Sequence, residues 1–306
     1  MNFIDYQHPT PPSFLSKLIQ ISMRLFGMKK KMEKKMIYSD FEKNPAKLPK
    51  SISHNFNVVE NIQSSRKVWT ISQKEFSTEV VILYLHGGAY VANISAQHWD
   101  LIKLLLTKTK AQIIIPDYPL APEATHKETY EFMEELYSKC LLEYASKHIV
   151  FIGDSAGGGL ALGFAQQLKN SNIKLPKEII LFSPWLDITM SNPDLEWTAK
   201  NDQLLSVAGL KSAGQKYGGN TDLKDFRLSP LYGNFKGLCR ISIFFGTNDI
   251  LVADVRKLKQ MLKDQQYNIN YFEYPSMFHA WVIITRLTET QDVINKVERI
   301  IFDDIH

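Results

Sequence analysis

The stretch Ile149-Val-Phe-Ile-Gly-Asp-Ser-Ala-Gly157 decides the fold, because an apolar run passes directly into a glycine-rich turn. Residues 149–152 have the composition of a buried strand, and a helical pattern follows in Gly157–Lys169. A Gly-x-Ser-x-Gly turn between a strand and a helix is typical of a tight elbow that exposes the serine oxygen above the sheet. Ser155 is therefore a candidate nucleophile. A helix cap formed by Ser155 or Asp154 would explain the same sequence, so the turn alone does not distinguish a nucleophile from a structural cap.

Strand and helix patterns alternate outward from this turn. The apolar runs that predict buried strands are Val80–Leu85, Gln112–Ile115, Ile149–Ile152, Glu178–Phe182, Ile241–Phe245 and Asn270–Tyr274. The helical patterns are His98–Lys108, Lys127–Ser146, Gly157–Lys169, Val252–Gln265 and Leu287–Ile301. This alternation predicts a parallel sheet, and Asn55–Glu60 with Lys67–Ser72 predicts an antiparallel pair at one edge. We expect an α/β fold with a mostly parallel sheet of about eight strands flanked by helices.

Two stretches do not fit the alternation. In Ser13–Met36, apolar residues recur at steps of three and four, at Phe14, Leu18, Ile21, Leu25, Met28, Met32 and Met36. This spacing predicts an amphipathic helix. The second stretch, Asp187–Arg227, is longer than a crossover helix needs and has a helical pattern near Gln203–Tyr217. We expect residues 1–50 to form an N-terminal helical cap segment, and residues 51–306 to form the main domain with a cap insertion at 187–227.

Composition limits the classes of function. The chain has 306 residues and a net charge of +4, which is too small to indicate a nucleic-acid partner, and its one concentrated basic run is Lys29–Lys35. Cys140 and Cys239 predict neither a metal site nor a disulfide framework, so a reducing, cytoplasmic setting fits best. The first residues do not have the pattern of an export signal. No window reaches the run of about 20 apolar residues that a membrane-spanning helix requires.

The segment His86-Gly-Gly-Ala-Tyr90 directly follows the strand pattern of Val80–Leu85. A loop of small residues at this place can point backbone N–H groups at the oxygen that becomes negative during acyl transfer. The expected donors of this oxyanion hole are the amides of Gly88, Ala89 and Ala156. Within the same loop we expect Gly87 to provide the turn, His86 to orient it, and Tyr90 to shape the substrate pocket. A simple strand-ending turn is the alternative.

A nucleophilic serine needs a base, and eight histidines compete for this role: His8, His54, His86, His98, His126, His148, His279 and His306. His8 and His306 lie near the chain ends, His54 precedes the sheet core, His98 and His126 border helices, and His148 enters its strand from the wrong end. His279 follows the last strand pattern, where a loop can reach back to Ser155. It is the candidate base.

The acid that orients this base is expected after the preceding strand. Asp249 ends the segment Ile241-Ser-Ile-Phe-Phe-Gly-Thr-Asn-Asp249, and the order Ser155, Asp249, His279 is that of serine hydrolases with this turn. The rival carboxylate, Asp254, is expected in the first turn of the next helix, where the helix dipole favours it.

With these residues in order, the chain resembles the hormone-sensitive lipase-like family of α/β-hydrolases, and in particular its bacterial esterases. The resemblance spans about Val80–Trp281. The segments that carry it are His86–Tyr90, Asp117-Tyr-Pro-Leu-Ala-Pro-Glu123, Gly153–Gly158, Ser183-Pro-Trp-Leu-Asp187, Asp249 and His279. It implies the α/β-hydrolase fold, an oxyanion loop at Gly87–Ala89, and a cap built from the N-terminal helices and the later insertion.

Two positions depart from the family pattern. Ala89 replaces the third glycine of the oxyanion loop, which leaves a backbone amide in place. Pro119 replaces the arginine usual in the Asp117–Glu123 segment, which puts in doubt any salt bridge that the family builds with that arginine.

The resemblance implies a carboxylesterase or lipase-type serine hydrolase that cleaves esters of short to medium acyl chains, with no metal and no organic cofactor. The expected partner is a small-molecule ester, and a dimer is possible. A catalytically silent small-molecule receptor of the same fold stays open as an alternative. So does an interfacial lipase that makes weak membrane-surface contact through the helix of Ser13–Met36 and its lysine run. The sequence does not determine the acyl length, nor whether amides, thioesters or acetylated sugars are substrates.

Overall fold

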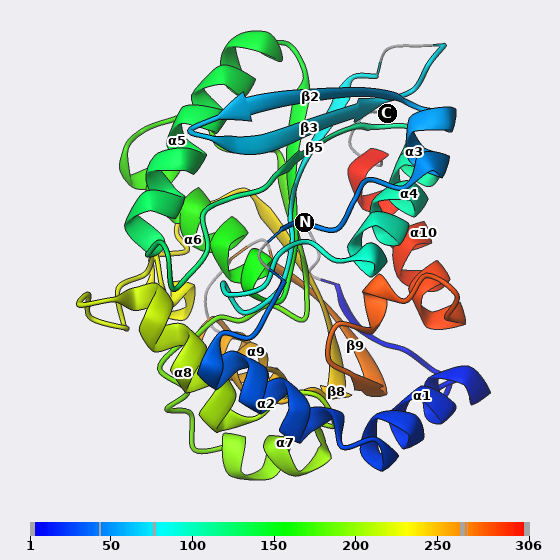
Figure 1. Ribbon diagram of the computed structural model, residues 1–306, viewed down its shortest axis with the longest axis vertical. Helices are drawn as coiled ribbons and strands as arrows, with labels where there is room; N and C mark the ends of the chain where they lie inside the picture. Colours follow the sequence, from blue (N-terminus) through cyan, green and yellow to red (C-terminus); the bar gives the residue numbers. More distant parts are fainter. Residues whose placement is uncertain (1–3, 43, 76–77, 264–266, 268, 303–306) are drawn as a thin grey trace.

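A computed structural model shows the chain as a single sheet between helical layers (Figure 1). It describes residues 4–42, 44–75, 78–263, 267 and 269–302, so His306 and the end of the helix predicted for Val252–Gln265 lie outside the described residues. The sheet has nine strands in the order β1-β9-β8-β7-β6-β4-β5-β3-β2. Its pairings are parallel except for β2 with β3 and β3 with β5, so the predicted antiparallel edge is confirmed.

The strands follow the predicted apolar runs closely. Their bounds are β1 Asp5–Gln7, β2 Asn57–Gln63, β3 Arg66–Ser72, β4 Val80–Leu85, β5 Gln112–Pro116, β6 His148–Asp154, β7 Glu178–Phe182, β8 Arg240–Asn248 and β9 Ile269–Phe278. The prediction of about eight strands missed β1. This three-residue strand pairs in parallel with β9 and places β1 and β2, which are consecutive in the chain, at opposite edges of the sheet.

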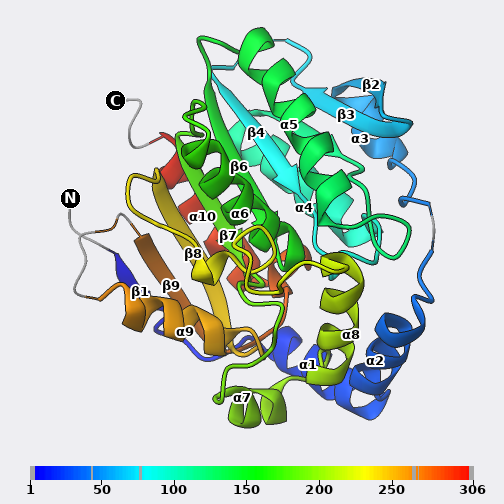
Figure 2. The same ribbon diagram turned by 90° about the vertical axis from the view of Figure 1, so that its left-hand side faces the viewer.

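Helices cover both faces of the sheet (Figure 2). The bounds are α1 Phe14–Leu25, α2 Met28–Tyr38, α3 Lys50–Asn55, α4 Ala96–Thr109, α5 His126–Glu143, α6 Ala156–Asn170, α7 Leu195–Asn201, α8 Val207–Gly218, α9 Val252–Met261 and α10 Thr288–Phe302, with 3₁₀ turns at Pro230–Tyr232 and Trp281–Ile283. Buried residues of α5, α6 and α9 join one core, and those of α4 and α10 join the other. Every described helix is too short or too polar to cross a lipid bilayer.

The central strand β4 shows why these runs become inner strands. All six of its side chains are buried, and successive residues alternate between the two cores. Val81, Leu83 and Leu85 pack under one helical layer, whereas the even-numbered neighbours pack under the other. A strand buried on both faces must be apolar throughout, as this one is.

Four helices lie together over the carboxyl ends of the strands, at the lower end of both views (Figures 1 and 2). These are α1 and α2 from the N-terminal segment, and α7 and α8 from the insertion. The single helix expected over Ser13–Met36 is wrong, because Gly27 takes a left-handed conformation with φ +61° and separates α1 from α2. The short helices α3 and α7 were not predicted.

The turn between β6 and α6 is as tight as its glycines suggest. A β-carbon on Gly153 would overlap the carbonyl oxygen of Gly157, and one on Gly157 would overlap the carbonyl oxygens of Leu85 and His86 at the end of β4. Only glycine lets α6 begin this close to β4. The elbow and the loop after β4 are therefore held against each other by backbone contact.

We expect Gly157→Ala to lower the free energy of unfolding by about 1–3 kcal/mol or more, because the new methyl group meets backbone that cannot move independently. Denaturant unfolding followed by circular dichroism measures this. Gly158→Ala is the matched control, because the nearest atoms to its β-carbon, in Pro184 and the Gly153 carbonyl, lie at 3.0–3.2 Å, whereas the nearest to a Gly157 β-carbon lies at 2.0 Å. An unfolding midpoint of Gly157→Ala above that of the control would contradict the proposed constraint.

Candidate active site

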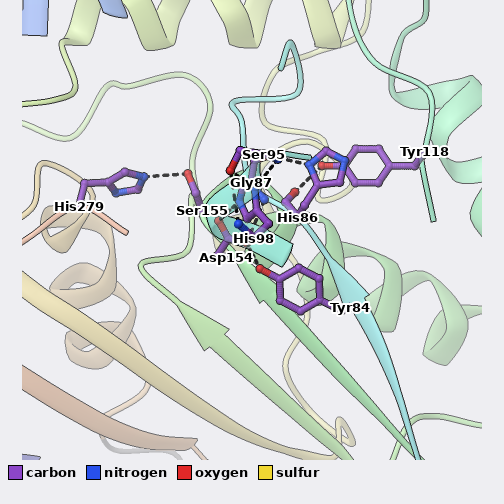
Figure 3. Close-up of polar contacts among 9 residues, drawn as sticks. All are labelled: Tyr84, His86, Gly87, Ser95, His98, Tyr118, Asp154, Ser155 and His279. Atoms are coloured by element: carbon purple, nitrogen blue, oxygen red, sulfur yellow. Dashed lines mark hydrogen bonds and ion pairs between the residues drawn. The ribbon is translucent and has the colours of Figure 1, made fainter. Parts of the chain in front are cut away.

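Three of the predicted site residues form a continuous hydrogen-bonded chain. Ser155 Oγ lies 3.0 Å from His279 Nε2, and His279 Nδ1 lies 2.9 Å from Asp249 Oδ2. Figure 3 shows the first of these contacts, with the His279 ring pointing at the serine hydroxyl. All three side chains are buried. The structure thus brings together residues that are up to 124 positions apart in the sequence.

The sheet register explains why the acid and the base meet. Asn248, the last residue of β8, pairs with Phe278, the last residue of β9. Asp249 and His279 are the next residues in each strand and leave the sheet side by side. The serine comes from the turn after β6, where its backbone is held in a strained conformation with φ +51° and ψ −119°. Its N–H donates to the carbonyl of Phe182 at 2.9 Å.

The electrostatics of His279 follow from its neighbours. Burial lowers the pKa of this imidazole, but the charge and hydrogen bond of Asp249, together with the charges of Asp202 and Asp154, outweigh burial and raise its pKa. Because a carboxylate can only accept, Nδ1–H must donate to Asp249, which leaves Nε2 free to accept the proton of the Ser155 hydroxyl.

The rival carboxylate Asp254 lies in the first turn of α9, as predicted. Its Oδ1 accepts a hydrogen bond from Asn192 Nδ2 at 2.9 Å. Burial raises the pKa of Asp254 to about 7. Asp254 is therefore hydrogen-bonded to the side-chain amide of Asn192, whereas the carboxylate bonded to His279 is that of Asp249.

Asp202 was missed by the sequence reasoning. It follows α7 in the cap insertion, is buried, and accepts the N–H groups of Leu204 and Leu205 at 2.7 Å and of Ile250 at 2.9 Å. Ile250 directly follows Asp249, so Asp202 ties the insertion to the loop that carries Asp249. Burial and the nearby Asp249 raise its pKa. A lone carboxylate in a loop gives no periodic signal by which the sequence could reveal this role.

The loop after β4 is anchored by Asp154, the residue before the serine. Asp154 Oδ1 accepts the Gly87 N–H at 3.0 Å and the Tyr84 hydroxyl at 2.7 Å, and Oδ2 lies 3.3 Å from His98 Nε2 (Figure 3). Burial alone would raise the pKa of Asp154, but His98 and Tyr84 outweigh it and the pKa is lowered. His98, which the sequence reasoning set aside as a helix-border residue, thus supports the loop.

The amide of Gly87 donates to Asp154 in this anchor, so Gly87, which the resemblance placed in the oxyanion loop, is not a free oxyanion donor here. Gly88 and Ala89 follow in left-handed conformations, with φ +125° and +53°. Both line the cavity at Ser155. Ala156 is the first residue of α6, where backbone N–H groups have no partner within the helix.

His86 orients the loop, as predicted from its place before the glycines. Its Nδ1 donates to the Gly87 carbonyl at 2.7 Å, and its ring stacks on Tyr118 with centroids 4.5 Å apart. Burial and the neighbouring His98 lower the pKa of His86 to about 4, so this ring is neutral. The Tyr118 hydroxyl donates to the His86 carbonyl at 2.6 Å.

A family model for the alpha/beta hydrolase fold matches residues 82–283, which is more than half of the chain. The chain belongs to this family. An esterase of Acinetobacter venetianus is 32% identical over 214 residues, covering 67% of this chain and 70% of that protein. An acetyl-hydrolase of Streptomyces hygroscopicus is 30% identical over 202 residues, covering 65% and 67%. Among crystal structures, an esterase/lipase from an uncultured bacterium has a TM-score of 0.78 and 25% identity, covering 95% of this chain and 98% of that one.

These matches confirm the predicted resemblance to the hormone-sensitive lipase-like α/β-hydrolases and make the chain a carboxylesterase or lipase-type hydrolase. In the segment where Pro119 replaces the arginine of the family pattern, Asp117 forms an ion pair with Arg66 of β3 at 3.5 Å. Within the described residues, no cluster of histidine, cysteine and carboxylate side chains is placed to hold a metal ion.

The hydrolase has a cavity of about 160 Å³ at Ser155 and His279. Both segments that lie over the strand ends line it: α2 with Met32 and Met36, and the insertion with Leu204, Leu205 and Leu210. Tyr90 is absent from this lining. Its ring is fully buried and stacks on the ring of Tyr217 in α8, with centroids 3.8 Å apart. Tyr90 therefore packs against α8, and the prediction that it contacts substrate is wrong.

For an ester hydrolase in which His279 accepts the serine proton, kcat/KM should rise with pH as this imidazole becomes neutral. The midpoint should lie above 6.5, the ordinary value, because the folded structure raises the pKa of His279. Asp202→Asn removes one of the charges that raise it, so the midpoint should move to lower pH. A pH–rate profile of kcat/KM on a soluble ester measures both.

Asp222→Asn, which removes an exposed carboxylate elsewhere in the insertion, is the control and should leave the midpoint unchanged. If Asp202→Asn lowers activity equally at all pH values, Asp202 acts on folding or packing alone and not through His279.

Proposed function

We propose that this protein is a serine esterase that hydrolyses carboxylic esters of short to medium acyl chains through an acyl-enzyme intermediate. The observation that carries the proposal is the chain of contacts from Ser155 through His279 to Asp249, at 3.0 and 2.9 Å, on the floor of an apolar cavity. A nucleophile, a base and an orienting acid in this order are the parts that serine acyl transfer requires.

In the first step Ser155 Oγ forms a bond to the ester carbonyl carbon while its proton moves to His279 Nε2. Asp249 holds the imidazole in the required tautomer and stabilises the imidazolium through Nδ1–H. Collapse of the tetrahedral intermediate breaks the bond to the alcohol, which takes the proton from His279. Water then repeats the sequence on the acyl-serine, and the acid leaves.

The oxyanion is held by the amides of Gly88, Ala89 and Ala156 in this proposal. The first two lie on the loop that Asp154 anchors, and the third begins α6, whose dipole favours negative charge at its start. Each such donor typically contributes about 2.7–4 kcal/mol to the stabilisation of the transition state. The anchor at Asp154 makes these donors rigid before substrate arrives.

The cavity supports a small acyl group. Its volume of about 160 Å³ is comparable with the roughly 150 Å³ apolar cavity that accommodates one benzene molecule. One relative is named an acetyl-hydrolase, which agrees with a short acyl chain. We further propose a cytoplasmic setting, which the two free cysteines suit.

The silent-receptor alternative is less well supported, because a receptor has no need of a base. His279 is present and lies within hydrogen-bonding distance of Ser155. A burst of p-nitrophenol on mixing with an activated ester distinguishes the two, since a receptor gives neither burst nor turnover.

Ser155→Ala should lower kcat by at least about 10³-fold on p-nitrophenyl acetate, leaving only the residual rate from binding and the oxyanion hole. Steady-state assays with the wild type and the variant measure it. Ser183→Ala, at another buried serine that follows a neighbouring strand, is the control. Full activity in Ser155→Ala would overturn the serine mechanism.

Among p-nitrophenyl esters from acetyl upward, kcat/KM should be highest for short chains and fall once the acyl group exceeds the cavity. Leu205→Ala enlarges the cavity, so the preferred chain length should increase by a few carbons. Leu228→Ala, which removes a buried leucine outside the lining, should lose similar stability without changing the preference. An unchanged preference in Leu205→Ala would place the acyl group elsewhere.

A further inference from the structure

Helix α1 turns a stripe of large apolar residues away from the protein. Four of them, Phe14, Leu18, Ile21 and Leu25, are here called the α1 stripe; all four are exposed, Phe14 and Leu25 to 82% and 78%. Their spacing of four, three and four residues places them on one line along the helix. The helix lies at the lower end of the molecule in both views (Figures 1 and 2).

The opposite side of α1 fixes the helix to the hydrolase. Ser16 is buried and donates to Glu289 of α10 at 3.0 Å. Gln20 donates to the Ser276 carbonyl at 3.0 Å and accepts from Asn248 Nδ2 at 2.9 Å. These polar contacts, together with the partly buried Ile19 and Met23 that pack against the core, hold the inner side of α1, while the α1 stripe faces outward.

Positive charge is concentrated in the segment that carries this stripe. Residues 13–38 contain seven lysines and arginines and one glutamate, a net charge of +6, whereas the whole chain carries +4. The rest of the protein is therefore net negative, at −2. Lys17 and Arg24 are exposed on α1 itself and line a groove of about 490 Å³ beside the stripe. In α2 the exposed cations are Lys30, Lys31, Lys34 and Lys35.

An exposed apolar stripe flanked by cations matches the boundary of a bilayer, where acyl chains lie below anionic headgroups. A second copy of the chain is a poorer match, because pairing two such faces brings two charges of +6 together. The charge asymmetry thus favours an anionic lipid surface as the occupant.

We propose that α1 binds the surface of membranes rich in anionic phospholipid, with the α1 stripe inserted at the headgroup boundary and the lysines of α2 above it. The same segment continues through Gly27 into α2, whose Met32 and Met36 line the cavity at Ser155. The contact therefore places the cap of the active site against the membrane. The proposed membrane contact does not depend on which ester the protein cleaves.

Vesicle sedimentation with the full chain tests the proposal. We expect binding to vesicles of phosphatidylcholine with phosphatidylglycerol, weaker binding to phosphatidylcholine alone, and loss of the difference at high salt. Leu18→Ser/Ile21→Ser/Leu25→Ser should lower the partition coefficient at least about tenfold, because three side chains lose their apolar contact. Lys30→Gln/Lys31→Gln/Lys34→Gln should lower binding to anionic vesicles only.

The matched control is Val59→Ser/Ile62→Ser/Leu142→Ser, which removes three equally exposed apolar side chains from β2 and α5. It should bind like the wild type. All variants should hydrolyse a soluble short ester at the wild-type rate, which separates this test from that of the proposed function. Wild-type protein that stays unbound to anionic vesicles, or a stripe variant that binds as well as the control, would overturn the proposal. So would a wild-type dimer that the stripe variant converts to monomer without any vesicle binding, since a second copy would then cover α1.

Discussion

A buried carboxylate, Asp154, holds the catalytic end of the sheet together. It is nearly inaccessible to solvent, and such a charge is tolerated only where donors surround it. Here they come from three separate segments: Tyr84 in β4, Gly87 in the loop after it, and His98 in α4. Removing one partner of a buried ionic group typically costs about 3–5 kcal/mol. The turn that carries Ser155 and the loop after β4 are therefore held as one rigid unit, which fixes the position of Ser155.

The inner sheet and the three candidate site residues could be predicted from sequence because each rests on local signals. Buried strands show as apolar runs, and Ser155, Asp249 and His279 each follow such a run directly. Strand β1 gives no such signal, because Asp5–Gln7 is short and polar and gains its place only by pairing with β9. The break at Gly27 was hidden for another reason: the apolar spacing continues across it, although the backbone turns.

The spacing also could not tell which side of α1 faces the protein. A period of three to four residues predicts one apolar side but not what covers it, and here the hydrogen bonds of Ser16 and Gln20 and the packing of Ile19 and Met23 decide the orientation. Asp202 and His98 were missed because the partners that give them their roles, Ile250 and Asp154, lie far away in the chain. Each of these side chains contacts segments that only the folded structure brings together.

The placement of β1 and β2 at opposite edges of the sheet has a mechanical consequence. The chain between them must cross all nine strands, a span of roughly 38 Å at the usual separation of neighbouring strands. On this route lie α1, α2 and the residues that roof the cavity. The part of the roof that comes from this N-terminal segment is thus held at both ends, by β1 and by β2, and not at one end only. Substrates must therefore enter beside or beneath this segment. Any motion that widens the entrance has to come from within the segment, where the turn at Gly27 separates α1 from α2.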